Sequence, residues 1–159
     1  MFRNVSVKKL FFLLLAAIIA LLLLFFLHGP FLDEGVEDAV VQALLERAGT
    51  GEEGIPAEGH KIFQVTMSED AMQVWGVFRT GVYRLEGGVP ELTAVSDAVP
   101  AEMVFIKEGE TWILAEYLEP GASGKDMREI FPWHLRPFAA MKGWFENGLS
   151  KQMEMYAGT

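Results

Sequence analysis

The sequence predicts an α+β domain with a curled antiparallel sheet and packing helices, placed after one N-terminal transmembrane helix. An unbroken run of 18 apolar residues occupies positions 10–27. Segments rich in aromatic and β-branched residues, joined by short turns, then follow one another between residues 61 and 117. Helical patterns lie before and after these segments but not between them, which favours an antiparallel sheet over β-α-β units.

The apolar run has the length and flanking charges of a membrane anchor. At about 1.5 Å per residue it spans roughly 27 Å, close to the hydrocarbon thickness of a bilayer. Arg3, Lys8 and Lys9 precede the run and no acidic residue does, so the positive-inside rule places the N-terminus in the cytoplasm. We therefore expect a single-pass cell-membrane protein with these parts: cytoplasmic tail 1–9, transmembrane helix 10–27 in contact with membrane lipid, stem 28–32 and extracytoplasmic α+β domain 33–159.

A cleaved signal peptide is the alternative to a retained signal-anchor. The apolar core of a signal peptide is shorter, about 7–15 residues, and ends in a small-x-small cleavage site. This run is longer and leaves through Leu27-His28-Gly29-Pro30, with no small residue three positions before a plausible cut. The sequence favours the retained anchor.

Composition narrows the possible partners. The formal net charge is −9, and the part after the apolar run holds ten basic and 22 acidic residues. Such a surface repels phosphate backbones, so no nucleic-acid partner is expected. The same charge disfavours an arrangement in which the domain lies flat on anionic lipid. The absence of cysteine excludes disulfides and thiolate zinc sites.

The first helix of the domain is predicted over residues 33–48. Its apolar stripe consists of Val36, Val40, Ala43 and Leu44. A loop is expected over residues 50–59, which are rich in glycine and acidic residues.

Four strands are predicted after that loop. Residues 61–67 alternate, which places Phe63, Val65 and Met67 on one face, and a turn at 68–70 leads into a strand over 72–85. Gly87-Gly88 marks a reversal, and residues 102–107 and 111–117 form a hairpin around Gly109.

The C-terminal part is predicted to be helical. Ser123 and Asp126 suit a capping box for a helix through Phe131, and Pro137 suits the first turn of the next helix. Asn147-Gly148 is expected to end that helix, before a last one with the stripe Leu149, Met153 and Tyr156. This element order is similar to that of cystatin-like and NTF2-like folds, in which a sheet wraps a helix.

Several short motifs in this order resemble a poorly characterised extracytoplasmic module of Gram-positive bacteria. They include Glu58-Gly59-His60-Lys61-Ile62, Val74-Trp75-Gly76-Val77-Phe78, Glu116-Tyr117-Leu118-Glu119-Pro120 and Lys151-Gln152-Met153-Glu154-Met155-Tyr156-Ala157. The module also forms the C-terminal tail of antirepressor membrane metallopeptidases of the BlaR1/MecR1 type. The chain departs from that group after Pro120, where Gly121-Ala122-Ser123-Gly124 replaces Arg-Asp-Gly and paired tyrosines, and it has no His-Glu-x-x-His peptidase motif. The resemblance implies an envelope location and a sensing or binding role, not proteolysis.

Catalytic signatures are weak in this sequence. Glu58 and His60 are two positions apart on a predicted strand, so they share a face and can form a hydrogen-bonded pair or play no role. Glu116 and Glu119 are three apart, which puts them on opposite faces and argues against an acid–base pair. No Gly-x-Ser-x-Gly elbow and no histidine pair at i, i+4 occurs. No catalytic residue, metal ligand or cofactor is therefore predicted.

Aromatic residues on the predicted sheet give the leading functional hypothesis. They can fill the core, or they can line a concave surface that binds a ligand. The candidate binding residues are Glu58, His60, Trp75, Tyr83, Trp112 and Glu116. The leading hypothesis is a non-catalytic, membrane-anchored binding or sensing module of the cell envelope that recognises an envelope protein or a small ligand. The alternatives are a small envelope hydrolase using Glu58, His60 and Glu116, and a structural or inhibitory envelope protein that binds one protein partner.

Overall fold

The computed structural model describes residues 11–18, 34–49 and 54–157. The chain separates into two compact units, residues 1–31 and 32–159. Within the first unit, residues 11–18 are helical; the rest of the expected span, the tail and the stem lie outside the described residues. Within the described ranges, no helix has both the length and the apolarity needed to cross a membrane.

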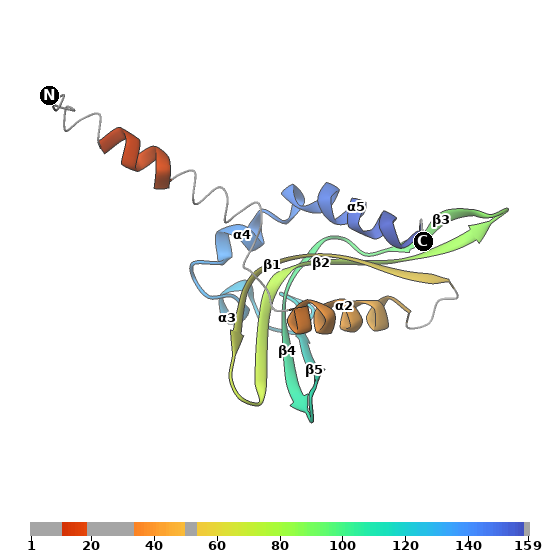
Figure 1. The fold of residues 1–159 in the computed structure, drawn as a ribbon, viewed down its shortest axis with the longest axis horizontal. Helices are drawn as coiled ribbons and strands as arrows, with labels where there is room; N and C mark the ends of the chain where they lie inside the picture. The colour runs from red at the N-terminus through yellow and green to blue at the C-terminus, as the bar shows by residue number, and fades with distance from the viewer. Residues whose placement is uncertain (1–10, 19–33, 50–53, 158–159) are drawn as a thin grey trace, which may run out of the picture. The chain divides into compact units, whose positions relative to one another are not determined.

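The second unit is an α+β domain, as predicted (Figure 1). One helix comes first, five strands follow, and the chain ends in helices. Its elements are α2 (Glu34–Gly49), β1 (Ile55–Met67), β2 (Ala71–Glu86), β3 (Val89–Val95), β4 (Val99–Glu108), β5 (Thr111–Leu118), α3 (Met127–Ile130), α4 (Arg136–Ala140), the 3₁₀ helix η1 (Lys142–Trp144) and α5 (Glu146–Ala157).

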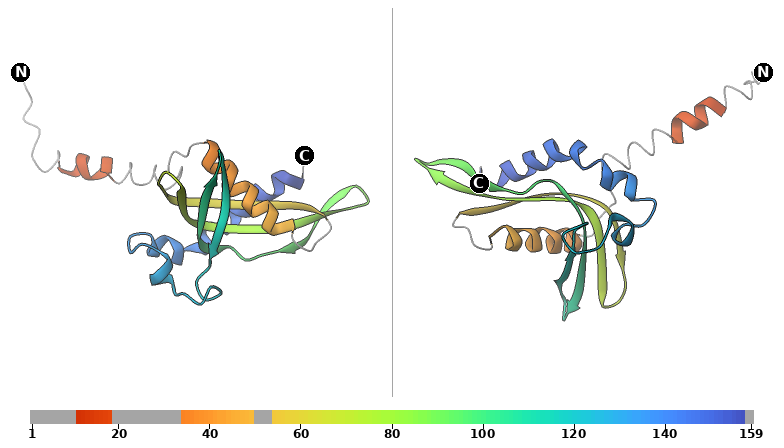
Figure 2. Two further views of the ribbon diagram at one scale, coloured as in Figure 1. Left: turned by 90° about the horizontal axis from the view of Figure 1, so that it is seen from below. Right: turned by 180° about the vertical axis from the view of Figure 1, so that it is seen from behind.

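All strand pairs are antiparallel, as predicted, and β3 is a fifth strand where only four were predicted. The sheet order is β1-β2-β4-β5, and β3 pairs with the second half of β2 on the same edge as β4. The sheet curls around α2, and α5 packs on the opposite face of β1 and β2 (Figure 2). β1 is an edge strand, so one of its sides is left for other elements to approach.

Helix α2 fills the concave face of the sheet. Its buried residues are the four of the predicted stripe: Val36, Val40, Ala43 and Leu44. They pack against Met72, Phe78, Met103 and Phe105, whose side chains are all buried. A buried phenylalanine removes a large apolar area from water, so this contact is the main core of the domain.

The predicted face of the first strand is wrong at one position. A β-bulge between Ile62 and Gln64 shifts the register against β2. Ile62 and Val65 therefore pack toward α2, whereas Phe63 packs on the other face against Phe138 and Phe145. An extra residue in one strand breaks the period of two, and strict alternation does not anticipate it.

Three predicted boundaries in the domain also change. β1 begins at Ile55, within the expected loop, because an edge strand tolerates Pro56. Asp126, not Ser123, is the N-cap of α3: its side chain accepts from two backbone N–H groups, while Glu129 completes the capping box. Asn147-Gly148 does not end a helix but lies in the first turn of α5, and the break falls earlier, at η1.

Two glycines let α5 approach the sheet closely. A Cβ atom on Gly59 would lie 2.4 Å from the backbone oxygen of Leu149, and one on Gly81 would lie 2.5 Å from the end of Met153. Because glycine has no Cβ, Leu149 and Met153 pack directly on β1 and β2, and both are buried. This close packing fixes the position of α5 along the edge of β1.

Candidate functional site

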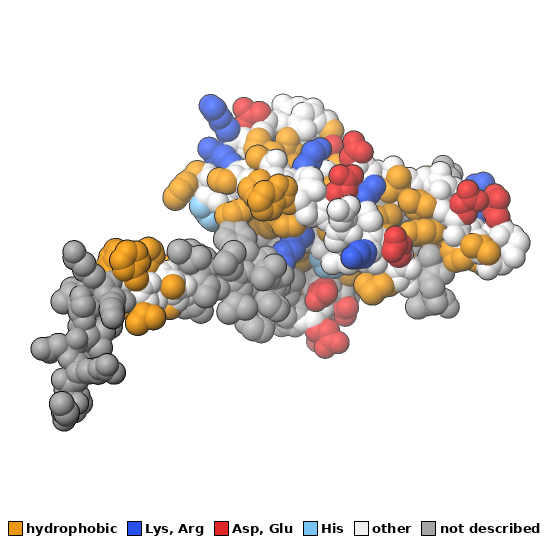
Figure 3. All heavy atoms as spheres, turned by 90° about the horizontal axis from the view of Figure 1, so that it is seen from above, with side chains coloured by type: hydrophobic (Ala, Val, Ile, Leu, Met, Phe, Trp, Pro, Cys, Tyr) orange, Lys and Arg blue, Asp and Glu red, His pale blue; other side chains and the backbone are white. Residues whose placement is uncertain are grey.

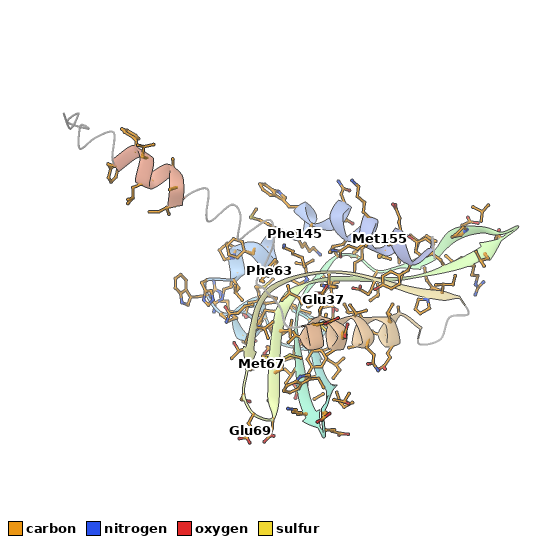
Figure 4. The ribbon with its side chains drawn as sticks, in the orientation of Figure 1. Glu37, Phe63, Met67, Glu69, Phe145 and Met155 are labelled. Carbon is orange, nitrogen blue, oxygen red and sulfur yellow. The ribbon has the colours of Figure 1, made fainter. Side chains whose placement is uncertain are left out.

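The first candidate site is a hollow at the edge of β1, called here the His60 hollow. Its volume is about 420 Å³, and three elements line it. Figure 4 shows Glu37 on α2 and Met155 on α5, on either side of β1. Its lining residues are Glu37, Val41, Glu58, His60, Gln152, Met155 and Tyr156.

Glu58 organises the polar side of this hollow. Its side chain is only 4 % exposed. One carboxylate oxygen accepts the Tyr156 hydroxyl at 2.8 Å, and the other lies 2.8 Å from His60 Nδ1. Both oxygens of a buried carboxylate thus have partners, which is the condition for keeping such a group inside a protein. Of the two alternatives left open for Glu58 and His60, the structure shows the hydrogen-bonded pair.

The hydrogen bond to Glu58 fixes the tautomer of the neutral His60 ring. An ionised carboxylate only accepts, so Nδ1 carries the proton and Nε2 presents a lone pair. Nε2 lies 3.9 Å from a Glu37 oxygen, and the His60 N–H donates to the Gln152 side-chain oxygen at 2.8 Å. His60 is therefore held from both its backbone and its ring, and its Nε2 lies on the side of Glu37.

All three tyrosines of the chain have a raised pKa. Burial is the first cause for each, and it raises the pKa of Tyr117 to about 12. For Tyr156, the hydrogen bond to Glu58 and the charges of Glu58 and Glu37 raise the pKa further. For Tyr83, burial and the charge of Glu154 act against the charge of Arg79.

These shifts predict an alkaline transition in stability. An unfolded phenol ionises near its ordinary value of about 10, whereas the native phenols hold their protons longer, so the free energy of unfolding falls as pH rises from about 10 toward about 12. Ultraviolet titration of phenolate should show the tyrosines ionising at higher pH in the native chain than in the unfolded chain, with Tyr117 near pH 12. In Tyr156→Phe the final phenolate absorbance should fall by about a third. A reversible native transition near pH 10 would contradict the packing of these rings.

A second hollow, of about 570 Å³, lies on the other face of the sheet beneath α3. Glu102 is buried at its floor and accepts from the Gln73 side chain at 3.0 Å. Burial raises the pKa of Glu102, as does the charge of Glu116, while Lys125 and Gln73 oppose the shift. Glu116 thus lies in this hollow and not with Glu58 and His60, so the predicted hydrolase trio is not assembled.

The predicted aromatic binding residues lie in three different places. The Trp75 indole donates to the Ile130 oxygen at 2.9 Å and packs on Phe131. Tyr83 packs with Ala57 and Met153, and Trp112 packs against the α2 core. These rings fill the core, because α2 and the C-terminal helices cover the faces on which they lie.

Three further polar residues of the His60 hollow, Glu37, Gln152 and Tyr156, were not predicted as site residues. Tyr156 was predicted to lie on an apolar helical stripe, and Glu37 and Gln152 had no predicted site role. Gln152 and Tyr156 are 92 and 98 positions from their partners in β1. A phenol at the end of an apolar helical stripe is a weak signal for a buried polar partner, because a buried hydroxyl needs one. Among the residues that the structure describes, the His60 hollow included, no group of three or more His, Cys, Asp or Glu side chains is placed to hold a metal ion.

No protein-family model matches the chain, and neither a curated protein nor a solved structure does. The resemblance to the Gram-positive module and the likeness to cystatin-like and NTF2-like folds therefore stay predictions.

Proposed function

We propose that the chain is a membrane-anchored, extracytoplasmic binding or sensing module that takes a small ligand in the His60 hollow. One observation carries the proposal: His60 lines an open hollow, and the hydrogen bond from its Nδ1 to buried Glu58 orients its ring. Binding sites combine an apolar wall with a few placed polar groups. Val41 and Met155 supply the wall, and Glu37 and His60 supply the polar groups.

The chemistry of the hollow selects a ligand with an ammonium or another hydrogen-bond donor. Its polar lining includes two carboxylates and an acceptor nitrogen, and no lysine or arginine is among the described residues that line it. Because Glu37 is half-exposed at the rim, it can approach a cation without losing all of its hydration. An anion would be repelled.

Titration of the purified full-length chain with n-hexylammonium, with n-hexanol as the uncharged comparison, tests this ligand class. We expect the ammonium to shift the NMR signals of His60 and Tyr156, and the alcohol to act more weakly. His60→Ala should weaken binding about tenfold and Glu37→Gln about twofold to fivefold. Glu34→Gln, on the same helix but outside the hollow, is the matched control. Equal effects of Glu34→Gln and Glu37→Gln would contradict the site.

The Glu58–His60 hydrogen bond also favours a second candidate, a small envelope hydrolase. A histidine oriented by a carboxylate through Nδ1 can take a proton from water at Nε2. No serine or threonine is among the described residues that line the hollow, so water would be the nucleophile. Turnover of p-nitrophenyl acetate that His60→Ala abolishes would favour this candidate over the binding module.

The anchor is tested separately from the ligand. We expect the full-length chain to stay with the membrane after carbonate extraction, and external protease on intact cells to degrade the domain. The supporting features are the apolar run of residues 10–27 and the basic residues before it. A released product that begins shortly after residue 27 would instead identify a cleaved signal peptide.

A further inference from the structure

Two of the four tryptophans are left exposed by the fold. Trp133 and Trp144 are 77 % and 80 % exposed, whereas Trp75 is buried and Trp112 packs against the α2 core. Tryptophan is highly buried on average, and large exposed apolar groups mark interaction surfaces. We call the outer surface of residues 133–144 the tryptophan face.

The tryptophan face is not an unpacked part of the hydrophobic core, because the inner side of the same segment already packs against the domain. Leu135 and Ala139 are buried beside Trp75. The Phe63 ring lies 6.1 Å from that of Phe138 and 5.5 Å from that of Phe145. Hydrophobic side chains gather over this end of the domain in Figure 3. The inner residues of the segment therefore pack against the domain, and Trp133 and Trp144 are left exposed.

The charge around this face differs from that of the rest of the domain. Residues 125–151 hold five of the ten basic residues that follow the apolar run, but only three of the 22 acidic ones. Lys125, Arg128, Lys142 and Lys151 are all exposed. The segment 125–151 therefore has a net charge of +2, in contrast to the acidic remainder of the domain.

We propose that the tryptophan face lies in the headgroup region of the membrane that holds the anchor, with exposed Lys142 beside the lipid phosphates. Tryptophan prefers the bilayer interface because its ring is apolar and its N–H is polar, and nearby lysines add attraction to anionic lipid. The inference rests on the membrane anchor of the proposed function. Six residues lie between Leu27 and Glu34, and a chain of this length reaches at most roughly 25 Å.

Reconstitution of the full-length chain in vesicles of phosphatidylcholine and phosphatidylglycerol tests this placement. Lipids brominated near the headgroup end of the acyl chains quench indoles at that depth. We expect tryptophan emission to fall by about half relative to unbrominated vesicles, because two of the four tryptophans lie on the face. Trp133→Gln/Trp144→Gln should remove the quenching. Trp112→Phe, which changes a packed ring, should retain it.

The outcomes separate the tryptophan face from the anchor. Flotation of the chain with the vesicles without bromine quenching overturns the placement of the face and leaves the anchor standing. Failure to float overturns both. A third outcome is a shift in tryptophan emission that grows with the protein-to-lipid ratio and is the same with and without brominated lipid. This outcome overturns the lipid contact and indicates that a second copy of the chain covers the tryptophans.

Discussion

Replacing Gly59 by alanine is expected to lower the free energy of unfolding by about 3 kcal/mol. The new Cβ would lie 2.4 Å from the Leu149 oxygen and 2.9 Å from the Leu149 Cα. These are backbone atoms of a helix, so no side chain can rotate away, and α5 must move off β1. Urea denaturation followed by circular dichroism measures the loss.

Gly148→Ala is the matched control for this substitution. A Cβ on Gly148 meets nothing within 4 Å, and the residue lies in α5. Alanine favours a helix over glycine by up to about 1 kcal/mol, so this variant should gain stability. The two glycine-to-alanine substitutions should therefore change the free energy of unfolding in opposite directions. If Gly59→Ala is as stable as the native chain, α5 does not pack on β1 as closely as the structure has it.

The same substitution should also disturb the His60 hollow. Gln152 and Tyr156 are on α5, and both bond to the polar pair on β1. Displacing α5 therefore separates Tyr156 from Glu58 and releases the backbone of His60. Stability and binding should fall together in Gly59→Ala, whereas a lining variant such as Glu37→Gln should change binding alone.

The sequence predicted those parts of the fold that follow from local periodicity. The stripe of α2 and the β4–β5 hairpin follow from spacing and from a glycine turn, and so does the Glu58–His60 pair, since residues two apart share a strand face. The bulge after Ile62 was not predictable in this way. It depends on β2 and on the rings of Phe138 and Phe145 beyond the strand.

The hollow itself depends on contacts between distant parts of the chain. Nothing near Glu58 in sequence shows that a phenol 98 positions away will reach it. Glu116 shows the converse error: its residue type suited a shared site with Glu58, but β5 carries it into the hollow beneath α3. Residue type identified the candidates, and only the pairing of strands and the path of α5 decides which of them meet.

A second large loss of stability is expected for Glu58→Ala. The carboxylate accepts from both His60 and Tyr156, and its loss deprives two groups at a buried position of their acceptor. Each lost partner costs about 1–3 kcal/mol, although the half-buried His60 ring can recover part of this from water. Removing the carboxylate also removes the free-energy cost of burying a charged group, which offsets part of the loss. We therefore expect a net loss of about 2–3 kcal/mol in the free energy of unfolding.

Graded variants resolve the contributions to that loss. Tyr156→Phe removes one hydrogen bond and should cost about 1 kcal/mol. In Glu58→Gln the amide oxygen can accept from only one partner while its NH₂ faces the other, so an intermediate loss is expected. For Glu154→Ala, at an exposed position, the free energy of unfolding should stay within about 0.5 kcal/mol of that of the native chain.

A double-mutant cycle between Glu58→Gln and Tyr156→Phe should show coupling, because the two side chains share one hydrogen bond. Additive losses would mean that the hydrogen bond between Tyr156 and Glu58 contributes nothing to stability.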